Sequence, residues 1–331
     1  MNASVAAPFV LRHKTALVLG ILVLQNTLLI LLMRYTLTVA GPRYLASTAV
    51  AMMEALKIVV CTAMVFMETG SYEAWIRKLR IEILYKPYEI VRLAVPSVLY
   101  TAQNNLLFIA LANLDAATYS VCYQTKILTT ALFSVFLLKK HLTRLKWFAL
   151  FLLTAGVALA ETASRTGEAK GSSDQSQLRG FMCVMLAACT SGFAGVYFEM
   201  ILKGNKASLW IRNIQMGIPS IVLAFFKVLV ADWAHVRRDG FFFGYTTAVV
   251  GVVVLQAAGG LVVAVVVKYT DNIQKSFAAA VSIVTSCIVS SFIFGFRPNG
   301  RFVLGLLFVC FSIFLYSQPV PPGQALPQYR R

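Results

Sequence analysis

Apolar residues run along this chain in long segments that are separated by short polar ones. Ten segments are long enough to cross a hydrocarbon layer about 30 Å thick as helices. They are residues 15–35, 45–67, 89–112, 116–138, 145–161, 179–202, 208–230, 246–268, 271–294 and 300–317. The pattern predicts an all-α polytopic membrane protein with ten transmembrane helices.

The composition agrees with a membrane protein. Of the 331 residues, 59% are hydrophobic and only 13% are charged, which excludes a soluble domain carrying a single apolar helix. The formal net charge is +17, but the basic residues lie in short clusters between apolar runs and form no stripe with interleaved aromatics. Such clusters are typical of loops that set membrane orientation. We therefore expect the lipid bilayer as a partner and no nucleic acid.

The order of polar and apolar segments predicts two similar halves. Lys and Arg are more numerous in one set of alternating loops, so this side and both termini are expected in the cytosol. Residues 162–178 are polar and rich in Gly and Ser, and predict a flexible lumenal linker between residues 1–161 and 179–331. Because each half has five predicted spans, the halves would face opposite ways, as in the inverted repeats of secondary transporters.

The stretch 95–134 contains polar residues in apolar surroundings, and it predicts two helices joined by a turn at residues 113–115. Lys126 follows Asp115 by eleven residues. A helix rises roughly 16 Å over that length, which reaches the middle of the hydrocarbon layer. A charge at this depth costs on the order of 3 kcal/mol, so Lys126 is a functional-site candidate by default.

Aromatic and amide side chains accompany Lys126. The candidates are Tyr119, Tyr123 and Lys126, which are spaced to share one helix face, and Tyr100, Gln103 and Asn104, which share a face of the preceding helix. Together they offer groups that can stack on a base, bind its edge and neutralise a phosphate. A polar contact between helices, with tyrosines at the membrane interface, is the alternative interpretation.

Further charged residues lie in or beside apolar runs. Lys275 follows the predicted turn at Asp271, whereas Lys268 lies near a span boundary and could extend to the interface. Glu54 and Lys57 are three residues apart within one apolar run. Either these two charges only neutralise each other, or a substrate phosphate competes for Lys57 and changes the pairing. Glu199 and Lys203 are expected to form a structural pair one helical turn apart.

Motifs of enzymes and metal sites are missing from the sequence. It contains no DxD, no P-loop and no GxGxxG, and its three histidines are far apart. The six cysteines lie within or beside apolar runs without CxxC spacing. We expect no enzymatic activity, no metal and no cofactor.

Several runs resemble a known family. They are Val95–Ser97 to Gln103–Asn105, Asn113–Ala117, Tyr123–Lys126, Ser191–Glu199, Trp210–Gln215, Gly240–Tyr245 and Val267–Ile273. These runs resemble the nucleotide-sugar transporters of the Golgi, in the group that carries CMP-sialic acid, UDP-galactose and UDP-N-acetylglucosamine. The resemblance extends from the first predicted helix to about Ser317. It implies the ten-helix drug/metabolite-transporter fold and exchange of a cytosolic nucleotide sugar for a lumenal nucleoside monophosphate.

The resemblance also implies roles for individual residues. Tyr100, Gln103, Asn104, Tyr119 and Asn213 match family residues around the nucleoside. Lys57, Lys126, Lys268 and Lys275 match residues near the phosphates or residues that gate the cavity.

Residues 127–134 and 259–264 look like the UDP-sugar branch of the group. Gly217 and Pro219 stand where the CMP-sialic acid carriers have tyrosine and serine. We expect an antiporter that moves UDP-N-acetylglucosamine or UDP-galactose into the Golgi lumen in exchange for UMP, by alternating access. An antiporter of CMP-sialic acid or another anionic metabolite, and a non-transporting membrane scaffold for glycosyltransferases, stay open as alternatives. Glycosyltransferases and further copies of the chain also stay open as partners.

Overall fold

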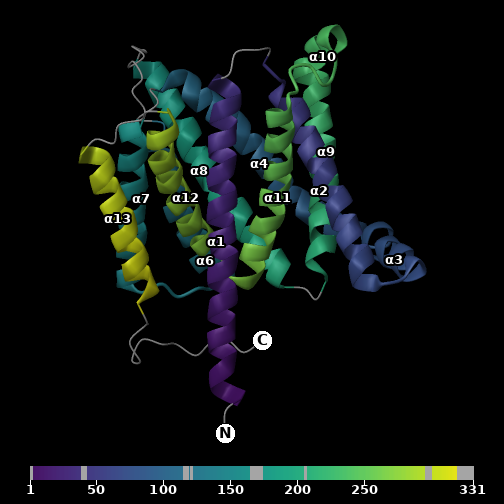
Figure 1. Cartoon of the computed structure of the whole chain (residues 1–331), viewed down its shortest axis with the longest axis horizontal. Coiled ribbons are helices and arrows are strands. Elements are labelled where there is room, and N and C mark those ends of the chain that lie inside the picture. Colours follow the sequence, from purple (N-terminus) through teal and green to yellow (C-terminus); the bar gives the residue numbers. More distant parts are fainter. Residues whose placement is uncertain are drawn as a thin grey trace. The chain divides into compact units, whose positions relative to one another are not determined.

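A computed structural model describes residues 3–38, 43–114, 119, 122–164, 174–204, 207–294 and 300–318 (Figure 1). Helices form all of the regular secondary structure in these ranges, so the all-α prediction is confirmed for them. The elements are α1 (Ala3–Thr38), α2 (Ala46–Thr69), α3 (Tyr72–Leu79), η1 (Arg80–Leu84), α4 (Pro87–Asn113), α6 (Lys126–Leu138), α7 (Arg144–Ser164), α8 (Asp174–Lys203), α9 (Leu209–Lys227), η2 (Val228–Asp232), α10 (Trp233–Asp239), α11 (Thr247–Tyr269), α12 (Asn272–Phe294) and α13 (Gly300–Ser317).

Six described segments are long and apolar enough to cross a membrane. They are Thr15–Met33, Ala46–Thr69, Gln177–Lys203, Leu209–Asp239, Thr247–Tyr269 and Gly300–Ser317. A chain with several such segments is a polytopic membrane protein. Ten crossings and an inverted repeat stay predictions.

The helices group into two compact units. Residues 1–101 and 201–271 form the first unit, and residues 102–200 and 272–331 form the second. Each unit is therefore assembled from two separate segments of the chain. Within the segment 102–200, α7 ends at Ser164 and α8 begins at Asp174, so helices include the outer residues of the predicted linker. Residues 165–173, both chain ends and the predicted turn residue Asp115 lie outside the described ranges.

In the first unit, α2 packs against α9 and α11, and α11 packs against α1. The α1 side chain Gln25 crosses to α11, where its Nε2 donates a hydrogen bond to the Leu255 carbonyl at 2.9 Å. A Cβ added to Gly259 would collide with the Gln25 side chain. The absence of a side chain at residue 259 thus makes room for a buried polar contact between two apolar helices.

In the second unit, glycines bring helices together at two places. A Cβ on Gly156 of α7 would lie 2.9 Å from the Gly305 carbonyl oxygen of α13, so the two backbones nearly touch. On α8, a Cβ at Gly192 would lie 2.8 Å from the Thr130 backbone nitrogen of α6. A Cβ at Gly195 would collide with the side chain of Asn272, the first residue of α12. Such small residues permit close approach of membrane helices, and here they place α6 and α12 beside α8.

The helix predicted over residues 116–138 is interrupted by a turn, which corrects the sequence analysis. Residues 122–124 are helical, Thr125 is in a turn, and α6 begins at Lys126. The Thr125 hydroxyl and backbone N–H both donate to the Cys122 carbonyl, at 2.6 and 3.2 Å. A threonine that binds a carbonyl three residues earlier tightens the backbone locally. Lys126 is therefore the first residue of a helix and not an interior one.

The Gly192→Leu substitution tests the close packing of α8. A leucine side chain would enter the α6 backbone, and overpacking of this kind costs about 1–3 kcal/mol. We expect a lower thermal unfolding midpoint for the purified protein in detergent. Gly20→Leu is the matched control, because a Cβ on Gly20 meets nothing within 4 Å. Equal midpoints for the two variants would contradict the packing described here.

Candidate functional site

A cavity of about 140 Å³ lies within the second unit, among α6, α8 and α12. Its lining residues are Gln124, Lys126, Ile127, Thr130, Val157, Ser191, Asn272, Lys275, Ser276, Ala279, Ala280 and Ile283. Two lysines thus face one space with hydroxyl and amide groups around them. The volume is below the roughly 300–1,000 Å³ of a site for a whole small-molecule ligand, and it suits a phosphate group or a sugar ring.

Lys126 lies in a cluster that joins four of the predicted site residues. Its Nζ is 4.1 Å from the centroid of the Tyr123 ring, within the range of a cation–π interaction. The Tyr119 and Tyr123 rings are stacked, with centroids 6.1 Å apart and planes 20° apart. Gln103 of α4 donates from Nε2 to the Tyr123 hydroxyl at 2.9 Å. The predicted aromatic, amide and cationic groups are therefore in direct contact.

Two amide oxygens near these lysines are buried without a hydrogen-bond partner in the described structure. Gln103 Oε1 belongs to the cluster around Tyr123, and Asn272 Oδ1 belongs to a residue that lines the cavity and is only 1% exposed. Leaving a buried acceptor unsatisfied costs about 1–3 kcal/mol. These oxygens are thus suited to accept hydrogen bonds from a ligand or from water.

Glu199 positions the start of α12, a role that the sequence analysis missed. Its fully buried carboxylate accepts a hydrogen bond from Lys140 Nζ at 2.8 Å and one from the Asn272 backbone N–H at 2.9 Å. A carboxylate at a helix N-terminus stabilises it through these free N–H groups. Because Lys275 follows in the same helical turn, Glu199 also fixes the backbone that carries this lysine. Lys203 Nζ donates to the Thr270 carbonyl, and its predicted pairing with Glu199 stays a prediction.

In the first unit, Glu54 and Lys57 form a buried ion pair with a 2.8 Å contact. The lysine stem crosses α11 at Gly260, where an added Cβ would lie 3.0 Å from Lys57 Cδ. Glu54 Oε2 is buried without a partner among the described residues. The pairing agrees with mutual neutralisation in this state.

Asn213 of α9 is buried, and its Nδ2 donates to the Leu209 carbonyl at 2.9 Å, whereas its Oδ1 is buried without a partner in the described structure. Tyr100 of α4 and Lys268 in the last turn of α11 are partly buried. These residues, with Glu54 and Lys57, belong to the first unit. The second unit holds Gln103, Asn104, Tyr119, Tyr123, Lys126 and Lys275, of which Asn104 is exposed. The predicted site residues thus fall into two sets, one in each unit.

A second buried ion pair, also missed, lies next to Asn213. Arg212 is 2% exposed, and its Nη1 is 2.6 Å from Glu89 Oε2 and 2.8 Å from Gln215 Oε1. Gln215 Nε2 donates in turn to the Glu82 carbonyl of η1 at 2.8 Å. These contacts join α9 to the first turn of α4 and to η1. The signal in the sequence is a lone arginine in a run of apolar residues.

The Glu199→Gln substitution tests the positioning of α12. Glutamine retains the shape but removes the charge opposite Lys140, at an expected cost of about 1–3 kcal/mol. We expect a lower unfolding midpoint and faster amide exchange at residues 272–276. The exposed Glu73→Gln substitution on α3 is the control. Unchanged exchange at residues 272–276 in the Glu199 variant would show that the carboxylate does not hold this turn.

Comparison with known proteins finds relatives along almost the whole chain. Residues 12–317 match the model of the nucleotide-sugar transporter family. A UDP-N-acetylglucosamine transporter of Rattus norvegicus is 51% identical over 312 residues, which cover 92% of this chain and 96% of that protein. A UDP-galactose translocator of Mus musculus is 46% identical over 302 residues, covering 91% of this chain and 77% of that protein.

A solved crystal structure has a similar fold, with a TM-score of 0.65 over 92% of this chain and 98% of its own, at 14% sequence identity. The family match extends from within α1 to the end of α13. The chain belongs to the nucleotide-sugar transporter family, whose members are transporters and not enzymes.

Proposed function

We propose that this protein carries UDP-N-acetylglucosamine or UDP-galactose from the cytosol into the Golgi lumen in exchange for UMP. The observation that carries the proposal is the cavity lined by Lys126 and Lys275, beside the stacked rings of Tyr119 and Tyr123. Uridine as the nucleoside is favoured by the named activities of the two relatives above.

The proposed site assigns each group a task. The tyrosine stack and the amides of Gln103 and Asn104 bind the uracil base. Lys126 and Lys275 bind the phosphates through charge-assisted hydrogen bonds. In the first unit, Tyr100 and Asn213 are assigned to the nucleoside and Lys268 to the phosphates or to gating. The proposed fold is the ten-helix drug/metabolite-transporter fold with two inverted five-helix repeats. Both termini are cytosolic in this proposal.

Charge explains why transport would occur as exchange. Two ammonium groups that line one closed cavity repel each other and lose water, which costs several kcal/mol. A bound phosphate removes most of this cost, so a closed state is reached mainly when an anion is bound. Because a ligand shifts a conformational equilibrium only by its differential affinity for the two states, both UDP-sugar and UMP must favour closure.

The ion pair of Glu54 and Lys57 adds a competing partner. With the pair formed at 2.8 Å, Lys57 is already neutralised. A substrate phosphate that approached Lys57 would release the Glu54 carboxylate. The pair would then re-form each time the phosphate leaves, which favours release of the product.

Removal of either cavity lysine tests the phosphate role. In Lys126→Ala and Lys275→Ala, loss of a charged hydrogen bond worth about 1.5–3 kcal/mol should lower uptake of labelled UDP-N-acetylglucosamine by roughly 10- to 100-fold. Uptake is measured in proteoliposomes loaded with UMP. Lys227→Ala at the end of α9 is the control for loss of a lysine. Full uptake by the Lys126 variant would make this lysine structural.

A comparison of loaded and empty vesicles tests exchange itself. We expect faster uptake of the UDP-sugar into vesicles that contain UMP than into empty ones, because the return step requires an anion. Equal rates would rule out exchange but would leave UDP-sugar transport standing. Faster uptake with internal CMP than with internal UMP would instead favour the CMP-sialic acid alternative.

A further inference from the structure

The loop between α2 and α4 forms a helical segment of its own, α3 followed by η1. Its start is fixed by Gly70, which caps α2 with a φ of +65° and donates to the Phe66 carbonyl. This left-handed conformation favours glycine. Because α2 is a candidate spanning helix that ends at Thr69, residues 71–86 begin at the level where a membrane would end.

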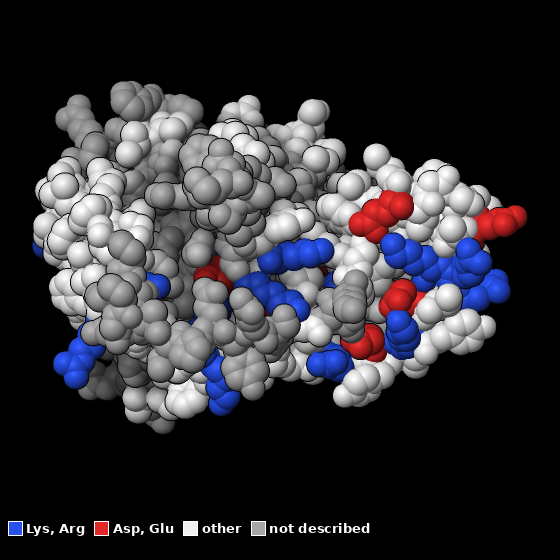
Figure 2. Space-filling view, turned by 90° about the horizontal axis from the view of Figure 1, so that it is seen from below, with Lys and Arg blue, Asp and Glu red and all other residues white. Residues whose placement is uncertain are grey.

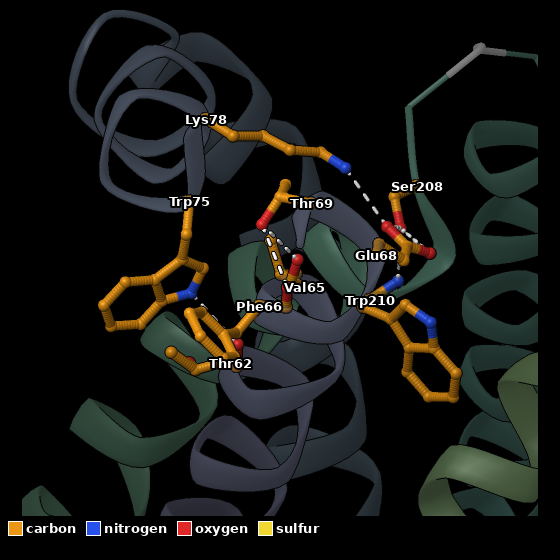
Figure 3. A network of polar contacts seen from close by, with 9 residues as sticks. All are labelled: Thr62, Val65, Phe66, Glu68, Thr69, Trp75, Lys78, Ser208 and Trp210. Atoms are coloured by element: carbon orange, nitrogen blue, oxygen red, sulfur yellow. Dashed lines mark hydrogen bonds and ion pairs between the residues drawn. The ribbon is translucent and has the colours of Figure 1, made fainter. Parts of the chain in front are cut away.

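Polar contacts hold one side of α3 against its own unit (Figure 3). Trp75 Nε1 donates to the Thr62 carbonyl of α2 at 3.1 Å, and Lys78 Nζ lies 3.1 Å from Glu68 Oε2. The Ser208 hydroxyl, which caps α9, lies 2.8 and 2.9 Å from the two oxygens of the same Glu68 carboxylate. The segment is therefore joined to the end of α2 and to the start of α9.

Apolar contacts fix the same side. Trp75, Leu79 and Ile83 pack against a buried cluster of Cys61, Val65, Ile211 and Ile214. Because Trp75, Leu79 and Ile83 are spaced four residues apart in the sequence, they form one stripe along the segment. The hydrophobic contact and the polar contacts together determine which face of α3 and η1 points outward.

The outward face combines large apolar groups with two arginines and one glutamate. Its exposed residues are Tyr72, Glu73, Arg77, Arg80, Ile81, Leu84, Tyr85 and Tyr88. Tyr72, Leu84, Tyr85 and Tyr88 are 67–72% exposed. Arg77 and Arg80 are also exposed, and neither forms an ion pair in the described part of the chain. Figure 2, which views the end of the molecule that carries α3, shows basic and acidic side chains among uncharged ones at the right of the picture.

We propose that this outward face binds the surface of a membrane that contains acidic phospholipids. The tyrosines and Leu84 enter the interface, where aromatic rings with polar edges are favoured. Arg77 and Arg80 bind the headgroup phosphates. A lipid partner suits the position of the segment, because the end of a spanning helix and the loop that directly follows it are already at the headgroups.

Lipid bound at the outward face would also affect helices that carry predicted site residues. Lys57 lies on α2 and Asn213 lies on α9, the two helices to which α3 is joined by Glu68 and Ser208. Lipid bound at the outward face thus limits movement at these helix ends. If the basic side of the chain faces the cytosol, the acidic cytosolic leaflet is the surface that it meets.

Hydrogen–deuterium exchange tests the lipid contact on the full-length protein in nanodiscs of phosphatidylcholine, with and without phosphatidylserine. We expect exchange at residues 72–86 to be slower by about 30-fold with phosphatidylserine, the effect of two basic side chains near an acidic surface. High salt should abolish the difference. Arg77→Gln combined with Arg80→Gln should also abolish it.

The control is the double variant Arg237→Gln and Arg238→Gln on α10, which removes the same charge at the other end of α9 (Figure 1). It should keep the phosphatidylserine effect at residues 72–86. The proposal is overturned if phosphatidylserine changes nothing in the native protein, or if both double variants lose the effect equally. Exchange is measured without substrate, so the result does not depend on the proposed transport activity.

Discussion

Charge in an apolar helix assembly must be neutralised close by, and this constraint governs most of the polar structure of the chain. Glu54 pairs with Lys57, Glu199 with Lys140, and Glu89 with Arg212. Each pair joins groups that would be costly to bury alone. The cavity in the second unit differs, because it gathers two lysines on one space. The structural pairs join opposite charges, whereas the cavity brings two like charges to one space.

Small residues make this arrangement possible. In a bilayer, an apolar side chain gains little free energy by exchanging lipid contacts for contacts with another helix. Membrane helices therefore associate through close packing and hydrogen bonds. Gly192 and Gly195 allow α6 and α12 to approach α8, and these are the helices that carry Lys126 and Lys275. The helix that α6 and α12 pack against also lines the cavity, through Ser191.

The sequence predicted what hydropathy and local spacing can reveal. Helices were predictable because a long apolar segment in a membrane must satisfy its backbone hydrogen bonds internally, and a helix does so. The cluster of Tyr119, Tyr123 and Lys126 was predictable because a charge in such a run is rare. The contact between Glu199 and Lys140 was not predictable, because the two residues are 59 positions apart in the sequence. Glu89 and Arg212 are separated by 123 residues. The turn at Thr125 was missed because one hydroxyl bond changes the backbone without changing hydropathy.

The start of α12 gives the cavity a charge that does not come from side chains. Asn272 and Lys275, which both line the cavity, lie in the first turn of this helix. The aligned peptide groups of a helix carry roughly half a positive elementary charge at its start, and here the Glu199 carboxylate accepts the Asn272 N–H at that end. This part of the electrostatic potential belongs to the backbone, so it persists when any single lysine is replaced. The electrostatic potential in this space thus depends on the path of the backbone as well as on the side chains.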